Sequence, residues 1–279
     1  MKRIVLGFAV AGVVLPLAGC DRSGGSSLSA AEQLEGALRP APLATALKKL
    51  PGAHLSGSTL FRVAPAARKS DDAGDDAITT KTELWLDRHG QYRLVETNDR
   101  EGGREAVLFG RELAVAIKPG KMIKRPAQEP EPTRLLEEAV SGPWAAWETV
   151  RRFATVERAG EVLRLGRSAK AVPVAASFAE ATPLRRWRDT ISVQSLEGEV
   201  RLDPKTGVPL AFDLKASFTA TREDKVALAG EIAVSTRLDG VGRTPIIAAP
   251  VAEALPPRQR TILEERALLG RGEPPKEAR

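Results

Sequence analysis

Cysteine and histidine are scarce in this chain of 279 residues, which contains one cysteine and two histidines. A single cysteine excludes a disulfide within the chain, so packing alone has to stabilise the fold. Neither His54 nor His89 lies beside a nucleophile motif or within a metal-binding motif such as His-Glu-x-x-His. The acidic run at residues 71–76 lacks the ligand spacing of a calcium loop. The sequence therefore predicts no enzyme, no metal site and no cofactor.

Aromatic residues are also few, at 4%, although 42% of the residues are hydrophobic. This composition is typical of a globular protein whose core is built from alanine, valine and leucine. The formal charge is +6, but basic and acidic residues are interspersed along the chain. Because phosphate binding needs a concentrated basic face, the pattern argues against nucleic acid as a partner.

The single cysteine, Cys20, follows a short apolar run near the N-terminus. Lys2 and Arg3 precede apolar residues 4–17, a run too short to span a bilayer but typical of a signal peptide. The segment Leu17-Ala18-Gly19-Cys20 then places two small residues before the thiol. The arrangement resembles the signal peptide of bacterial lipoproteins, which implies cleavage before Cys20 and attachment of lipid, including acyl chains such as palmitate, to its sulfur. An ordinary secretory signal or a short membrane anchor is the alternative.

The residue after Cys20 indicates in which membrane the protein is expected to be anchored. Asp21 resembles the signal that keeps enterobacterial lipoproteins in the inner membrane, which implies a lipid-anchored protein on the periplasmic face of the cell membrane, with the outer membrane as second choice. The domain organisation expected is a signal peptide at 1–19, lipidated Cys20 with a flexible Gly- and Ser-rich tether at 20–28, one domain at 29–270 and a disordered tail at 271–279.

Helices are expected in three regions. Ser29 and Glu32 have the spacing of a capping box, which predicts a helix to about Arg39, and a second short helix fits residues 43–50. Residues 136–153 have helical spacing and are divided by Gly142-Pro143, so two short helices are expected there, the second beginning at Pro143. A final helix is expected over residues 257–269.

Elsewhere the hydrophobic pattern has the period of two that is typical of strands. Turn residues separate these strands at short intervals, which favours an antiparallel meander. The expected strands are 54–63, 80–87, 91–96, 106–109, 113–117, 122–125, 156–158, 162–165, 171–178, 191–196, 200–202, 208–218 and 226–238.

The segment from Gly198 to Leu210, with the turn Asp203-Pro204-Lys205-Thr206-Gly207, is similar to the strand, Asp-x-x-Thr-Gly turn and Pro-Leu segment of the LolA/LolB-like lipoprotein carrier superfamily. The order of elements along the chain also resembles that superfamily. The resemblance implies an α+β fold in which an antiparallel meander sheet curves into an unclosed half-barrel. N-terminal, mid-chain and C-terminal helices would then pack on or over its concave face.

A concave face of apolar residues has to be covered by helices or by another apolar group such as an acyl chain. The candidate lid is the helical segment 136–153, with Trp144 and Trp147. The candidate floor of the hydrophobic cavity is the set Leu210, Phe212, Leu214 and Phe218. The alternative is that these helices fill the concavity permanently and no ligand binds.

The cluster Arg185-Arg186-Trp187-Arg188 surrounds an indole with basic side chains, which suits an anionic membrane surface. The alternative is an exposed beginning of a strand with Trp187 turned inward.

Two functional hypotheses follow. The first is a membrane-anchored periplasmic lipoprotein that binds lipid or an acylated ligand in a hydrophobic half-barrel. The second is a structural or adaptor lipoprotein of a cell-envelope complex, which binds envelope proteins through a sheet edge or its C-terminal helix.

Overall fold

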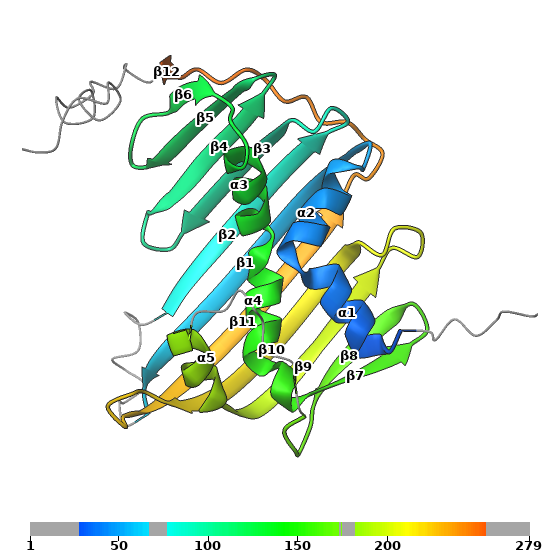
Figure 1. The fold of residues 1–279 in the computed structure, drawn as a ribbon, viewed down its shortest axis with the longest axis vertical. Coiled ribbons are helices and arrows are strands. Elements are labelled where there is room, and N and C mark those ends of the chain that lie inside the picture. The colour runs from blue at the N-terminus through cyan, green and yellow to red at the C-terminus, as the bar shows by residue number, and fades with distance from the viewer. Residues whose placement is uncertain (1–27, 67–76, 173, 175–181, 255–279) are drawn as a thin grey trace, which may run out of the picture.

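The computed structural model describes residues 28–66, 77–172, 174 and 182–254. Within them, one open twelve-stranded sheet carries helices on one face (Figure 1). The strand order is β12-β6-β5-β4-β3-β2-β1-β11-β10-β9-β8-β7. All neighbours are antiparallel except β12 and β6. The predicted α+β class with an unclosed antiparallel sheet is confirmed.

The first half of the chain supplies β1 (Gly52–Pro65), β2 (Ala77–Asp87), β3 (Tyr92–Asn98), β4 (Gly103–Phe109), β5 (Glu112–Lys118) and β6 (Ile123–Pro126). The second half supplies β7 (Ala154–Ala159), β8 (Val162–Arg167), β9 (Ser192–Leu202), β10 (Pro209–Thr221), β11 (Ala227–Asp239) and β12 (Glu253–Ala254). Strands β1 to β6 form one meander and β7 to β11 another, the pairing of β1 with β11 joins the two into one sheet, and β12 adds to the edge of the first beside β6.

The helices are α1 (Ala30–Leu38), α2 (Pro40–Lys48), α3 (Glu131–Ala139), α4 (Ser141–Val150) and α5 (Thr182–Asp189), with a 3₁₀ turn η2 at Arg151–Phe153. The predicted capping box is present, since the Ser29 hydroxyl accepts from the Glu32 backbone and the Glu32 carboxylate accepts from the Ser29 backbone. Helices α1 to α4 run across the middle of the sheet on the same face (Figure 1). The expected N-terminal and mid-chain helices over this face are therefore confirmed.

Several boundaries differ from expectation. Helix α2 begins at Pro40, because proline suits the first turn, where its missing N–H has no helical partner. For the same reason Pro143 lies within the first turn of α4, and the break between α3 and α4 falls at Val140. The two strands predicted at 191–196 and 200–202 are one strand, β9, with a register shift in its pairing to β10.

Other predicted elements are wrong or untested. Residues 171, 172 and 174 of the strand expected at 171–178 are not in a strand. The cluster at residues 185–188 belongs to helix α5, so the alternative that it begins a strand is wrong, although Trp187 is turned inward onto Phe218. The signal peptide with Cys20 and the expected helix at 257–269 lie outside the described residues, as does the tail at 271–279.

Two clusters of buried residues stabilise the contact between helices and sheet. The lower cluster, under α1 and α4 in Figure 1, includes Leu34, Trp147, Val150, Val193, Val200, Phe212, Leu214, Phe218 and Val234. The upper cluster, under α2 and α3, includes Leu43, Leu47, Leu55, Leu84, Tyr92, Leu94, Leu136 and Leu238. Each large apolar side chain buried in this way contributes about 1.5–3 kcal/mol.

Tyr92, the one tyrosine of the sequence, is completely buried in the upper cluster. Its hydroxyl donates a hydrogen bond of 2.9 Å to the carbonyl of Pro132 at the start of α3. Burial raises the pKa of Tyr92 above its usual range, and the nearby carboxylates of Glu131 and Glu129 raise it further. The folded protein therefore holds this phenol in its neutral form.

We expect Tyr92→Phe to cost about 1 kcal/mol at neutral pH, because it removes this hydrogen bond. Above about pH 10 the unfolded state ionises its tyrosine while the folded state keeps the proton, so the wild-type protein loses stability as pH rises and the variant is spared this loss. Urea unfolding of both proteins at a series of pH values measures the difference. Equal dependence on alkaline pH in the two proteins would contradict the prediction.

Candidate functional site

A cavity of about 210 Å³ lies between the helices and the centre of the sheet. The helices contribute Leu38, Leu43, Leu47, Glu138, Ala139, Val140, Ser141, Gly142 and Pro143. The sheet contributes Leu55, Gly57, Thr59, Thr80, Thr82, Glu96, Pro209, Phe212 and Thr236. The cavity is therefore bounded by residues of both the lower and the upper cluster.

The helical wall and the sheet floor of the cavity differ in chemistry. The wall formed by α1 and α2 is made of leucines, whereas the floor carries a stripe of hydroxyls. The stripe follows from strand register, because Gly57 of β1 stands between Thr82 of β2 and Thr236 of β11, and Thr59 pairs with Thr80. One step further along the same face the pairs are Leu55 with Leu84 and Leu55 with Leu238, so the floor becomes apolar again. The site can accept an apolar group with polar atoms on one side.

An ion-pair network forms one rim of the cavity. The Arg104 guanidinium of β4 pairs with Glu96 of β3 and, at 2.5 Å, with Glu138 of α3. Burial by itself would lower the pKa of Arg104, but its hydrogen bonds to the two carboxylates outweigh that effect and raise it. The network ties α3 to the sheet. Since Thr80 and Glu96 are only half-buried and Glu138 is exposed, the cavity opens to solvent on this side.

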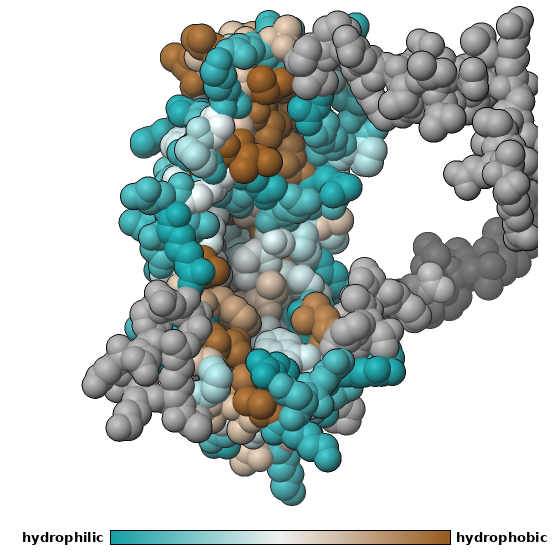
Figure 2. Space-filling view, turned by 90° about the vertical axis from the view of Figure 1, so that its left-hand side faces the viewer, coloured by the Kyte–Doolittle hydropathy of each residue, from teal (hydrophilic) through white to brown (hydrophobic). Residues whose placement is uncertain are grey.

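An exposed apolar pair continues the floor of the cavity. Phe61 and Ile78 face each other across β1 and β2, two residues beyond the pair Thr59 and Thr80 and on the same face. Each is 40% exposed. Figure 2 shows the left-hand side of the view in Figure 1, where hydrophobic residues gather in the upper and lower parts with more polar residues between them. The concave face thus offers apolar surface outside the cavity as well as within it.

Of the six cavity residues expected from the sequence, Phe212 lines the cavity. Trp147, Leu214 and Phe218 are buried in the lower cluster, where α4 packs directly on the sheet. Leu210 is half-buried against the upper cluster. Trp144 is half-buried, and its ring lies 5.9 Å from the Arg39 guanidinium and 5.8 Å from that of Arg151. Over the lower cluster the helices therefore fill the face, as the alternative expectation states.

The sequence pattern missed most of the residues that line the cavity. Thr59, Thr80, Thr82 and Thr236 occupy inward positions of otherwise apolar alternation, but only the pairing of β1, β2 and β11 aligns them in one stripe. Threonines at inward positions of strands whose other inward residues are apolar are the signal that could have indicated a gap in the core.

The two histidines lie away from the cavity. His54 is on the opposite face of β1 from Leu55, where its ring pairs with Glu83 and stacks on Trp85. His89 belongs to the turn between β2 and β3. Within the described ranges, no three histidine, cysteine, aspartate or glutamate side chains come together as a metal site would require.

The helices of the described part of the chain are short, and none of them has both the length and the hydrophobicity needed to cross a membrane.

No family model matches this chain, and no curated protein matches it with statistical significance. Solved structures with a partial likeness include MucB in complex with MucA(peri), at 14% identity and a TM-score of 0.22, covering 80% of this chain and 61% of that chain. The MucA/MucB complex of Pseudomonas aeruginosa has the same identity and TM-score, covering 73% of this chain and 56% of that one. A lipovitellin structure solved for lipid-protein interactions has 6% identity and a TM-score of 0.24, covering 72% of this chain and 26% of that one.

This chain therefore spans less than two thirds of the length of each of these solved chains.

Proposed function

We propose that this protein binds the acyl chain of a lipid or of an acylated ligand between its helices and the concave face of its sheet. The observation that carries this proposal is the cavity whose floor continues into the exposed pair Phe61 and Ile78. An apolar surface of this kind is stabilised when another apolar group covers it. The protein binds its ligand without catalysing a reaction.

The volume of the cavity fits part of an acyl chain. A volume of about 210 Å³ exceeds the roughly 150 Å³ that accommodates a benzene-sized molecule, and it is below the roughly 300–1,000 Å³ of pockets for drug-sized ligands. The cavity therefore holds one segment of an acyl chain, and the rest of the chain lies along Phe61 and Ile78. The hydroxyl stripe and the network around Arg104 bind polar atoms of the ligand.

The proposal includes a location. Cys20, in a segment that resembles a lipoprotein signal, carries the lipid anchor on the periplasmic face of the membrane, with the inner membrane favoured by Asp21. The short segment between Cys20 and α1 holds the cavity within a few nanometres of the bilayer. Mass spectrometry of the protein isolated from membranes tests the anchor, because a lipidated Cys20 has to be the first residue of the mature chain.

The test of ligand binding is a variant that fills the cavity. The double variant Thr82→Leu/Thr236→Leu adds apolar bulk on both sides of Gly57 and is expected to weaken binding of the fluorescent fatty acid cis-parinaric acid at least about tenfold. Fluorescence titration of the chain lacking residues 1–20 measures the affinity. Native mass spectrometry of the same protein detects lipid that co-purifies with it.

The matched control is Thr82→Val/Thr236→Val, which removes both hydroxyls while keeping the volume of the side chains. It is expected to weaken binding of the fatty acid by only about threefold, because it removes two of the four hydroxyls of the stripe but leaves the space of the cavity open. Equal binding by the leucine and valine variants would exclude the cavity as the site. A wild-type domain that binds no fatty acid and carries no lipid would overturn the proposed function.

A second candidate function is that of an adaptor for envelope proteins. The segment between β11 and β12 crosses the upper edge of the sheet without forming a helix or strand of its own (Figure 1). It exposes Ile246 by 96% and Val251 completely. Cross-linking in intact cells, compared between the wild type and Ile246→Asp/Val251→Asp, tests this function, because loss of a specific adduct in the variant would favour an adaptor.

A further inference from the structure

Helix α5 stands at the lower end of the molecule, where two inward side chains anchor it. The Trp187 ring meets the Phe218 ring edge-on, at 6.0 Å between centroids and 80° between planes. The Arg188 guanidinium donates a hydrogen bond of 2.8 Å to Glu148 of α4, and both side chains are largely buried. The Thr190 hydroxyl, just after the helix, bonds to the backbone of Thr221. The helix therefore has a fixed orientation on the sheet.

That orientation turns the other face of α5 outward. Leu184, Arg185 and Arg186 are all exposed. Arg186 and Trp187 also line a surface hollow together with Arg222, Glu223 and Lys225 of the turn between β10 and β11. The exposed face thus combines the apolar side chain of Leu184 with cations from two separate elements, and the half-buried Trp187 ring forms part of the hollow between them.

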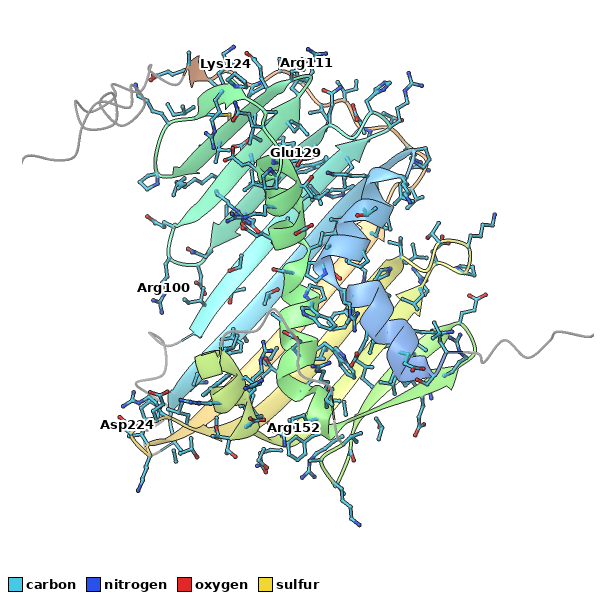
Figure 3. All side chains as sticks on the ribbon, viewed as in Figure 1. Arg100, Arg111, Lys124, Glu129, Arg152 and Asp224 are labelled. Atoms are coloured by element: carbon cyan, nitrogen blue, oxygen red, sulfur yellow. The ribbon has the colours of Figure 1, made fainter. Side chains whose placement is uncertain are left out.

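Among the residues that the structure describes at this end, the charges do not cancel. Arg222 pairs with Asp224 at 2.6 Å, and Arg152 pairs with Asp189 at 2.9 Å. Figure 3 places Arg152 and Asp224 at this end of the molecule. Among the described residues, Arg185, Arg186 and Lys225 form no ion pair, and Glu223 is the one carboxylate that lines the hollow.

We propose that this end of the molecule, formed by α5 and the turn between β10 and β11, docks on the surface of a bilayer that contains anionic phospholipid. Clustered arginine and lysine side chains are attracted to an anionic surface, and each contributes about fivefold in affinity. An exposed leucine side chain such as Leu184 enters the region between headgroups and acyl chains at such a surface. A face that carries both cationic side chains and an exposed apolar side chain therefore matches the headgroup layer of an anionic bilayer.

The docking face lies next to the exposed apolar pair Phe61 and Ile78. Phe218 contacts Trp187 on one side and lies 6.4 Å from the Phe61 ring on the other, so the docking face borders the exposed apolar pair Phe61 and Ile78. The docked protein presents that pair to the bilayer. The docking does not depend on whether the cavity binds an acyl chain.

Co-sedimentation with vesicles tests the docking. The full-length chain carrying Cys20→Ser, which has no lipid anchor, is mixed with vesicles of phosphatidylglycerol and phosphatidylcholine or of phosphatidylcholine alone. We expect it to bind the anionic vesicles more tightly, and Arg185→Glu/Arg186→Glu to weaken that binding at least about twentyfold. Arg185→Gln/Arg186→Gln is expected to have an intermediate effect. The N-terminal apolar segment is the same in every variant.

A matched control reverses two charges at the opposite end. Arg88 and Arg111 are exposed in the neighbouring turns between β2 and β3 and between β4 and β5, and Figure 3 shows Arg111 at the upper end. Arg88→Glu/Arg111→Glu has the same net charge as the α5 variant and is expected to keep binding within about threefold, since only the total charge of the molecule changes.

Three results would overturn the proposal. They are equal binding to neutral and anionic vesicles, equal losses in the α5 variant and the control, and binding of inorganic phosphate in the hollow without any association with vesicles. Because Arg185 and Arg186 do not line the cavity, cis-parinaric acid binding should be unchanged in the α5 variant. A failure of docking is thereby distinguished from a failure of the proposed function.

Discussion

Replacing Phe218 with alanine is expected to lower the free energy of unfolding by about 3–5 kcal/mol. The side chain is almost completely buried in the lower cluster and contacts α5 through Trp187. Its ring also lies over Gly230 of β11, where a Cβ atom would come within 2.1 Å of the ring. Removing the ring leaves a cavity that the sheet, held by its backbone pairing, can close only in part. Urea unfolding of the wild type and the variant measures the loss.

Gly230 provides the matched test of this packing. Gly230→Ala alone is expected to cost about 1–3 kcal/mol, because the new methyl group overlaps the Phe218 ring. In the double variant Phe218→Ala/Gly230→Ala the methyl group occupies space that the ring has left. The loss of stability in the double variant should therefore be smaller than the sum of the losses in the two single variants by about 1 kcal/mol or more. Additive losses would show that the close approach of ring and glycine does not govern stability here.

Replacing Gly103 with alanine is expected to cost about 3 kcal/mol. Gly103 begins β4 with a φ of +150°, which L-residues rarely adopt. A Cβ atom there would lie 2.0 Å from the carbonyl oxygen of Glu96, a backbone atom held by the pairing of β3 with β4. Relief of the overlap has to move the strand that carries Glu96, so the rim formed by Glu96 and Arg104 is disturbed as well. Thermal and urea unfolding measure the effect.

Gly90→Ala is the control for this variant. Gly90 also has a positive φ, of +75°, but no atom lies within 4 Å of the position of its Cβ. Its replacement is expected to cost only about 1–2 kcal/mol, which is the strain of a left-handed alanine. If the two glycine variants lost equal stability, the overlap with the Glu96 carbonyl would have no consequence.

Most of the secondary structure could be predicted from local signals. The capping box of α1 depends on Ser29 and Glu32, which are three residues apart, and hairpins such as β2 with β3 depend on a turn flanked by alternating residues. Such features need no information from distant parts of the chain. The alternative that residues 185–188 begin a strand failed for the opposite reason, since the helix there is held by contacts with Glu148 and Phe218, which are distant in sequence.

The candidate site was predicted less well than the fold. The sequence indicated an apolar face with a helical lid, and of the six residues expected at a cavity Phe212 lines the one described here. It did not indicate where space remains. Leu214 and Phe218 have the same inward pattern as Phe212, yet neither lines this cavity, and Phe218 is covered by Trp187 of α5. Whether an inward side chain is covered depends on the path of a helix that lies far away in the sequence.

Alternation, caps and turns in the sequence therefore determine that this chain forms an antiparallel sheet with amphipathic helices on one face, because each of these signals acts over a few residues. The pairing of β1 with β11, the alignment of Thr82 and Thr236 beside Gly57, and the position of the α3–α4 junction above them are decided by tertiary structure. The physical reason is that strand register and helix packing are set by the fit of surfaces between distant segments. The cavity, and the function proposed for it, arise from that fit.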